Sequence, residues 1–256
     1  MRLLLALACV LVGCGSQDDD PTLEQTIEQT YKVEPGVNIT IENGDGSISI
    51  YGADTDEVSV QATKRAYSQG RLNGIAVNVS AQPGSITIQT SFPPKPTWGL
   101  SDRSGTVDYV LIVPRTAQIS RLELANGEIL LEEMQGAPVH AQLGSGRLSA
   151  HNCFCELHLA VMSGLLSVIY DWWEDTKFSV DANIVDGNAS ASLPGDACFH
   201  LMADAPAGKI DNDFADQEER DGSEVSKIDK VIGATANADI KIHATDGNIQ
   251  VSEQNP

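Results

Sequence analysis

The chain has 256 residues, with 16 basic and 36 acidic side chains and a net charge of −20. Nucleic acids and anionic membrane surfaces are polyanions, so this charge argues against both as binding partners. Aromatic residues make up only 5% of the chain, and no long helical pattern occurs. Glycine, asparagine, aspartate and serine recur at short intervals, which predicts an all-β fold of short strands and tight turns.

The first 13 residues have the features of a bacterial secretion signal. Arg2 precedes an apolar run over residues 3–12, which is shorter than the roughly 20 residues needed to span a bilayer. Residues 11–14 read Leu-Val-Gly-Cys and resemble the lipobox, after which a signal peptidase leaves an N-terminal cysteine that carries lipid. The alternative is an ordinary signal peptide followed by an unrelated cysteine.

The lipobox resemblance implies that Cys14 is lipidated and that the membrane is a partner through this anchor. Residues 14–25 are then the lipidated cysteine and a polar, flexible tether, and residues 26–256 are the folded domain. An aspartate directly after the cysteine favours inner-membrane retention in Gram-negative sorting. Gly15 stands there instead, which implies an outer-membrane lipoprotein of the cell envelope.

The folded domain opens with alternating apolar and polar residues, which predict half-buried strands between residues 37 and 88. The Asn-Gly-Asp-Gly segment at 43–46 and the Pro-Gly pair at 83–84 predict turns. Residues 68–73 are predicted to form a polar loop.

A proline-rich segment at residues 92–99 interrupts this rhythm. Its prolines cannot donate hydrogen bonds to a strand ladder, so the segment predicts a projecting loop. Trp98 lies on that loop. It either stacks on a ligand or, as we favour, packs back over the edge of the sheet.

A short phrase then recurs, in which a glycine is followed by inward-facing residues two and four positions later. Apolar residues also stand three, five and seven positions before most of these glycines. The glycines of the phrase are Gly46, Gly127, Gly146, Gly164, Gly187, Gly208 and Gly247. From the second to the sixth they are spaced by about 20 residues, and the last interval is about twice as long.

This period predicts a single β-solenoid with rungs of about 20 residues, in which each turn is hydrogen-bonded to the next. The glycines are expected at bends that need a positive φ or leave no room for a Cβ atom. The alternative is a β-sandwich, because Asn-Gly and Asp-Gly are also hairpin signals. Hairpins do not require a constant period, so the solenoid is favoured.

Four stretches, at residues 33–62, 107–114, 126–129 and 246–251, resemble the "putative adhesin" domain of bacterial envelope proteins, a domain of unknown function. The resemblance covers roughly residues 26–252. It implies a right-handed parallel β-helix, and it assigns no catalytic or ligand-binding residue. The name of the domain rests on its architecture rather than on an established activity.

Trp172 and Trp173 are the strongest candidates for a binding surface. Neighbouring residues of a strand or turn cannot both face inward, so one indole is expected to be exposed. An exposed indole can stack on a sugar or contact another protein. The alternative is that the pair covers a side or an end of the solenoid.

One cluster has the residue types of a metal site: His151, Cys153, Cys155 and His158. On a strand, His151 and both cysteines share one face, whereas His158 points to the other. The two cysteines are closer in sequence than zinc ligands usually are, so core packing is favoured over a disulfide or a metal site. A bridge from Cys153 to Cys198 would have to span about two rungs, which disulfide geometry disfavours.

The acidic segment at residues 211–221 either binds calcium through its carboxylates or, as we favour, is a solvated loop. Asp211 and Asp213 are predicted to share a face, which is the only sign of paired catalytic carboxylates. The sequence has no nucleophile elbow, phosphate-binding loop or zinc-protease motif. It therefore predicts no catalytic residue, no metal and no cofactor.

These features predict a non-catalytic, envelope-anchored lipoprotein whose β-solenoid binds or scaffolds a glycan or an envelope protein. The alternative is a polysaccharide-active enzyme on a β-helix. The candidate binding residues are Trp98, Trp172 and Trp173. Specificity is expected where the 20-residue period fails, at residues 92–105, 170–175 and 211–230.

Overall fold

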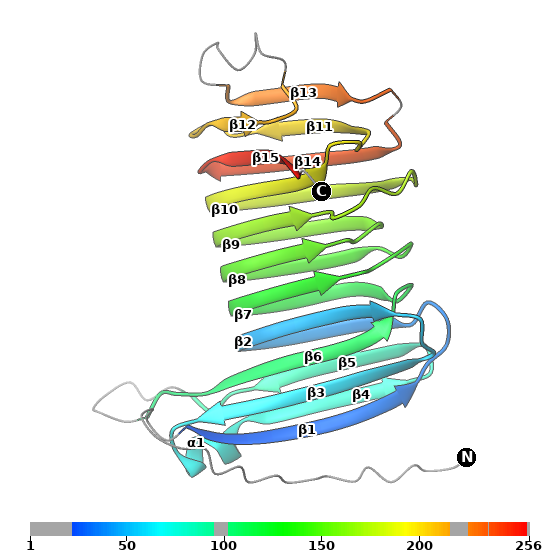
Figure 1. Ribbon diagram of the computed structural model, residues 1–256. Coiled ribbons are helices and arrows are strands. Elements are labelled where there is room, and N and C mark those ends of the chain that lie inside the picture. Colours follow the sequence, from blue (N-terminus) through cyan, green and yellow to red (C-terminus); the bar gives the residue numbers. More distant parts are fainter. Residues whose placement is uncertain (1–21, 95–101, 216–224, 235, 255–256) are drawn as a thin grey trace.

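The computed structural model describes residues 22–94, 102–215, 225–234 and 236–254 (Figure 1). In chain order the elements are β1 (Leu23–Lys32), β2 (Asn38–Ala53), β3 (Glu57–Ala66), α1 (Gln69–Gly74), β4 (Ala76–Gln82), β5 (Ser85–Ser91), β6 (Thr106–Pro114), β7 (Gln118–Glu132), β8 (Val139–His151), β9 (Glu156–Ile169), β10 (Phe178–Pro194), β11 (Phe199–Asp204), β12 (Ile210–Asn212), β13 (Lys227–Ile232), β14 (Ala238–Asp246) and β15 (Ile249–Gln254). Within these residues, no helix has both the length and the apolar character that a membrane crossing requires.

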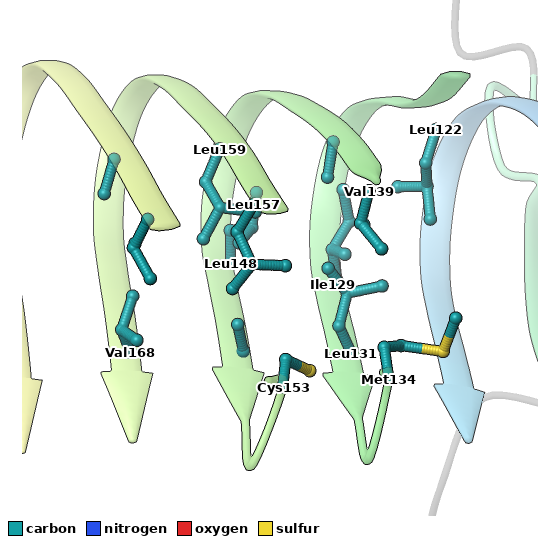
Figure 2. Packing of buried hydrophobic residues seen from close by; sticks show 14 of the residues in the cluster. Leu122, Ile129, Leu131, Met134, Val139, Leu148, Cys153, Leu157, Leu159 and Val168 are labelled. Atoms are coloured by element: carbon teal, nitrogen blue, oxygen red, sulfur yellow. The ribbon is translucent and has the colours of Figure 1, made fainter. Parts of the chain in front are cut away.

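The centre of the molecule is a stack of five long strands, β2, β7, β8, β9 and β10, each parallel to the next. Every one of these strands runs through its glycine without ending and curves around the core (Figure 2). The glycine phrases are therefore bends within strands that have parallel neighbours. This excludes the hairpin sandwich and gives the largely parallel, solenoid-like sheet that the sequence predicts.

The core is filled from both halves of each curved strand. Around Gly146, the residues five and three positions before it, Ala141 and Leu143, are at most 1% exposed. Leu148 and Ala150, two and four positions after it, are equally buried. The predicted inward positions are thus confirmed. Burying one such leucine contributes about 1.5–3 kcal/mol, and the alanines keep the interior narrow.

The corner glycines form one continuous column. Its order along the stack is Gly46, Gly127, Gly146, Gly164, Gly187, Gly247 and Gly208. All but Gly208 have φ between +132° and +152°. A Cβ atom built on any glycine after the first would lie only 1.6–2.0 Å from the carbonyl oxygen of the preceding one. Both predicted reasons for glycine are therefore confirmed.

The order of the column corrects one prediction. Successive glycine phrases were expected to stack in sequence order, with each turn bonded to the next. Instead β14 and β15 lie between β10 on one side and β11 and β12 on the other. Residues 199–212 come first in the sequence and form the outer rung. The chain then returns through β13, which pairs antiparallel with β11. The last two strands, β14 and β15, occupy the space between the outer rung and β10.

The N-terminal end of the stack is built differently, because the two halves of β2 pair with different strands. The first half pairs with β5, which forms an antiparallel hairpin with β4. The second half pairs with β6, which continues into β3 and β1 in an antiparallel sheet. The coil thus divides into two antiparallel layers at this end, a feature that the period did not predict. The turn predicted at 83–84 is confirmed as the β4–β5 hairpin.

Two boundaries also differ from the predictions. The first strand begins at Leu23, three residues before the predicted start of the folded domain. The predicted polar loop at 68–73 is largely the short helix α1, because the Ser68 hydroxyl caps it by accepting a hydrogen bond from the Arg71 amide. The Arg71 side chain is buried and donates to backbone carbonyls of Pro93, Pro94 and Ser104, so α1 holds the start of the proline-rich segment and the chain at Ser104.

Candidate functional site

The predicted tryptophan pair belongs to an aromatic row that crosses several rungs on one side of the core. The rings of the row are Phe154, Tyr170, Trp172, Trp173, Phe178, Phe199 and Phe214, with neighbouring centroids 5.1–6.1 Å apart. Tyr170 is fully buried, and its hydroxyl donates to the carbonyl of Cys153 at 2.9 Å. These rings pack the loops that follow β8 and β9 against the core.

The two tryptophans divide as the sequence predicts. Trp173 packs inward against Tyr170, Phe178 and Phe199. Trp172 remains 44% exposed. Its indole N–H donates to the Glu174 carboxylate at 3.3 Å, which orients the ring. The pair therefore covers the core with one indole and presents the other to solvent.

The metal-like cluster is not brought together. Cys153 and Cys155 are buried in a turn rather than on a strand, and both are free thiols. Burial raises the pKa of the Cys153 thiol to about 12, so the free thiol is uncharged at neutral pH, as suits a side chain packed in an apolar core. His158 stacks on His140 at 4.6 Å, and His151 pairs with an aspartate. The interpretation as core packing is confirmed.

His151 takes part in a polar network that joins the turn after β8 to Asp171, the residue before the two tryptophans. Its Nε2 atom lies 2.6 Å from Asp171 Oδ2. Asn152, which adopts a left-handed conformation with φ of 51°, donates to the same oxygen and accepts the Asp171 amide at 2.9 Å. The predicted shared face of His151 and the cysteines is therefore wrong, because the strand ends at His151 and the chain reverses at Asn152.

A groove of about 500 Å³ lies on the outer face of the first strand halves, across β2, β7, β8 and β9. Most of its lining comes from the two outward positions that precede each corner glycine. The position four residues before the glycine supplies Glu42, Glu123, Gln142 and Ala160. The position two residues before it supplies Ala125, Gly144 and Met162.

Small residues make the hollow, and larger ones bound it. Phe92 lies over Gly44, where a Cβ atom would be 3.0 Å from its ring. Ala125 and Gly144 follow in the same column and leave the floor low. Met162, 61% exposed, stands at the far side. The groove is therefore about two rungs wide, or roughly 10 Å at 4.8 Å per strand.

The polar side of the groove is held in place by Arg121. Its guanidinium donates to both oxygens of Glu123 at 2.7 and 2.8 Å and reaches Glu42 at 2.9 Å. Each carboxylate oxygen has a second lone pair to offer a ligand. With Gln142 beside them, the carboxylates present hydrogen-bond acceptors along one side of a mostly apolar hollow. This suits a ligand with hydroxyl or amine donors around an apolar face.

Sequence reasoning missed this groove. Its residues fall in fixed positions before glycines, but Glu42 and Glu123 become neighbours only because Gly46 stacks directly on Gly127. The sequence contains the column positions. It does not show that Gly46 and Gly127, which are far apart in the sequence, are neighbours in the stack.

The remaining predicted sites give no second candidate. Asp211 and Asp213 are both exposed, and Asp213 accepts the Glu253 amide at 3.2 Å. The rest of the acidic segment, at 216–221, lies outside the described residues. Trp98 and Cys14 lie outside them as well. Within the described ranges, no group of three or more histidine, cysteine or acidic side chains is arranged to hold a metal.

The architecture defines a class: a solenoid-like, largely parallel β-protein with an antiparallel end. The chain belongs to the toastrack family DUF4097, whose sequence profile matches residues 18–252. This finding agrees with the adhesin-like resemblance of the sequence. No curated protein matches the sequence.

One solved structure supports the fold. A putative cell adhesion protein from Clostridium sporogenes aligns over 90% of this chain and 100% of its own, with a TM-score of 0.52 and 16% identity. A putative adhesin from Bacteroides fragilis aligns over 89% of this chain and 97% of its own, with a TM-score of 0.26 and 10% identity. The likeness to the first shows a shared fold.

Proposed function

We propose that this protein is a non-catalytic, lipid-anchored envelope protein whose solenoid presents a binding surface for a glycan or another envelope protein. The groove over β2, β7, β8 and β9 carries this proposal. It combines oriented acceptors with an apolar floor on a face whose side chains are held in register by parallel strands. A right-handed coil with rungs of about 20 residues is the form of scaffold that we propose.

The anchor is proposed to be lipid on Cys14. The lipobox-like residues 11–14 and the polar residues that follow support it, and Gly15 supports the outer membrane. Changing Cys14→Ser should move the chain from the membrane fraction to the soluble fraction of cells. A variant that still sediments with membranes like the wild type would refute the anchor.

Ligand binding is tested by filling the groove. Ala125→Gln places a longer side chain on the groove floor, and glycan-array binding should weaken at least about tenfold, or about 1.4 kcal/mol. Val185→Gln is the matched control, because Val185 occupies the same column two residues before a corner glycine but does not line the groove. Equal binding by both variants and the wild type would exclude this groove as the site.

The same screen tests the non-catalytic part of the proposal. Glycans are recovered after incubation and their length is measured. Glycans of unchanged length support a binding protein. Shortened chains, with the shortening abolished by Asp211→Asn or Asp213→Asn, would instead establish the polysaccharide-active enzyme.

A further inference from the structure

The N-terminal end of the stack presents two sheet edges side by side. Within the described residues, β1 pairs only with β3, and β4 pairs only with β5. β1 ends the layer that continues from the second half of β2, and β4 ends the layer that continues from the first half (Figure 1). Each layer therefore has an edge strand with a row of backbone donors and acceptors that no described strand satisfies.

One of these two edges, β4, lacks the usual protection against pairing. Natural edge strands carry lysines, prolines or bulges that block the approach of another strand. β13, the edge strand of the opposite end, has that protection in Lys227, Asp229 and Lys230. β4 has the sequence AVNVSAQ, without a charge or a proline, and Val77 and Val79 on its inner row are only partly buried. β4 and β13 therefore differ in the charge that controls edge pairing.

β4 is complementary to a second copy of itself. When two copies extend one sheet across a two-fold axis, inner residues must face inner residues, so the axis passes through a residue. An axis at Val79 opposes Val79 to itself and Val77 to Ala81. The outer row opposes Asn78 to Ser80. None of these pairs brings like charges together.

β1 is complementary to itself as well. An axis at Gln29 opposes Ile27 to Tyr31 on the half-buried inner row, and Glu28 to Thr30 on the outer row. This register pairs residues 26–32, in which Glu28 and Lys32 are opposed to Thr30 and Thr26, and Glu24 lies outside the paired segment. Apolar pairs and uncharged polar pairs stabilise antiparallel strands.

One axis can serve both layers. Gln29 is aligned through β3 and β6 with Ile50 of β2, and Val79 is aligned through β5 with Ile41 of β2. Ile50 lies four residues after Gly46, and Ile41 lies five residues before it. Both positions are thus at similar distances from the bend, so an axis through Gln29 in one layer passes close to Val79 in the other.

We propose that this end is a self-association surface, at which two copies join end to end and extend both layers through β1–β1 and β4–β4 pairing. A chain with a net charge of −20 repels its own copies, but β4 is uncharged and β1 carries only Glu24, Glu28 and Lys32. Each strand pair would form about six to eight backbone hydrogen bonds. The inference is independent of the ligand in the groove.

Cross-linking through a single position tests the geometry. With Val79→Cys in the full chain, mild oxidation should yield a disulfide-linked dimer, because directly opposed residues have Cβ atoms about 4.5–5.5 Å apart. Val231→Cys is the matched control on the opposite edge strand, where Val231 is 55% exposed, and it should not cross-link above the wild-type background. Equal cross-linking of both variants would indicate random collision and overturn the proposal.

A charge swap tests the same interface in solution. Asn78 and Ser80 are both exposed, so the double change Asn78→Lys and Ser80→Lys should leave the fold intact and oppose lysine to lysine twice. Sedimentation of the purified full chain in detergent should show a dimer for the wild type and at least a tenfold weaker dimer for the double variant. Asn78→Lys with Ser80→Glu should restore the dimer. A wild-type monomer at about 100 µM, or no restoration, would refute the interface.

Discussion

Replacing one corner glycine by alanine should damage the stack far more than its single methyl group suggests. At Gly146, the new Cβ atom would lie 1.9 Å from the carbonyl oxygen of Gly127 and 2.9 Å from its carbonyl carbon. The φ of +133° is also a conformation that residues with a side chain rarely adopt. Both obstacles act at the centre of the β7–β8 pairing.

The size of the effect follows from these distances. Because real Cβ contacts do not fall below 3.0 Å, β7 and β8 have to separate locally by about 1 Å. Loss of about two backbone hydrogen bonds costs roughly 2 kcal/mol, and the strained φ costs a further 1–3 kcal/mol. The free energy of unfolding should therefore fall by about 3–5 kcal/mol, which lowers the urea midpoint by more than about 1 M.

Three other glycines separate the two causes. Gly144→Ala meets a carbonyl oxygen at 2.3 Å but has an ordinary φ, and Gly136→Ala has a φ of +78° with nothing within 4 Å. Gly70→Ala in α1 has neither obstacle and should stabilise slightly, by about 0.4–1 kcal/mol. Urea midpoints should be lowest for Gly146→Ala, intermediate for Gly144→Ala and Gly136→Ala, and highest for Gly70→Ala. A midpoint for Gly146→Ala within error of the Gly70→Ala value would refute the reasoning.

Two further predictions concern the core and the far end of the stack. Leu148→Asp should unfold the neighbouring rungs, with a loss of at least about 4 kcal/mol in urea unfolding, because it buries an unpaired charge at a fully buried site. His200 lies 2.8 Å from Asp229 and 3.2 Å from Asp239, and the hydrogen bond to Asp229 is the main reason that its pKa is raised. Its stabilising contribution should be fully present below the unfolded value of 6.5 and be lost as the pH rises through the raised pKa, so His200→Gln should cost more stability at about pH 5.5 than at about pH 9.

Each of these has a control. Arg147→Asp changes the neighbouring outward position and should lower the urea midpoint by much less than Leu148→Asp. An equal loss from the two changes would show that Leu148 does not face the core. For His200, the wild type and the His200→Gln variant are compared at each pH, and a stability difference that does not shrink towards high pH would contradict the ion-pair explanation.

The regular part of the fold was predictable because each corner requires glycine for two independent reasons. At Gly187, for example, the backbone needs φ of +132°, and a side chain would meet the carbonyl of Gly164 at 2.0 Å. Two independent constraints on one position leave glycine as the only residue that fits, so the period is visible without a structure. The buried positions then follow from alternation on either side of each bend.

The order of the rungs was not predictable from the same signal. Gly247 must be a glycine because a carbonyl oxygen of the neighbouring rung lies too close for a side chain. Any other glycine of the column would supply the same carbonyl contact. The spacing from Gly208 to Gly247 is therefore compatible with either order. What decides the order is the antiparallel return of β13 along β11, and β13 itself is a short, charged strand with little pattern.

The groove could not be predicted for a related reason. A binding site on a solenoid is made by side chains from neighbouring rungs, so it depends on adjacency more than on composition. Ala125 and Gly144 are unremarkable small residues until they stand between Phe92 and Met162. The exposed indole of Trp172 was easier to expect, because two adjacent tryptophans cannot both enter the core whatever the rung order.

The glycine column also determines where function can vary. Because each corner glycine contacts the next, the strands cannot slip in register without a clash, and every outward column stays aligned over several rungs. Substitutions in those columns change the surface and leave the core unaltered, so a groove or a ridge arises from a few outward residues. An end-to-end pair across β1 and β4 would join two such faces through continuous sheets. If the dimer forms, each assembly holds two copies of the groove at a fixed separation, which favours ligands that repeat, as polysaccharides do.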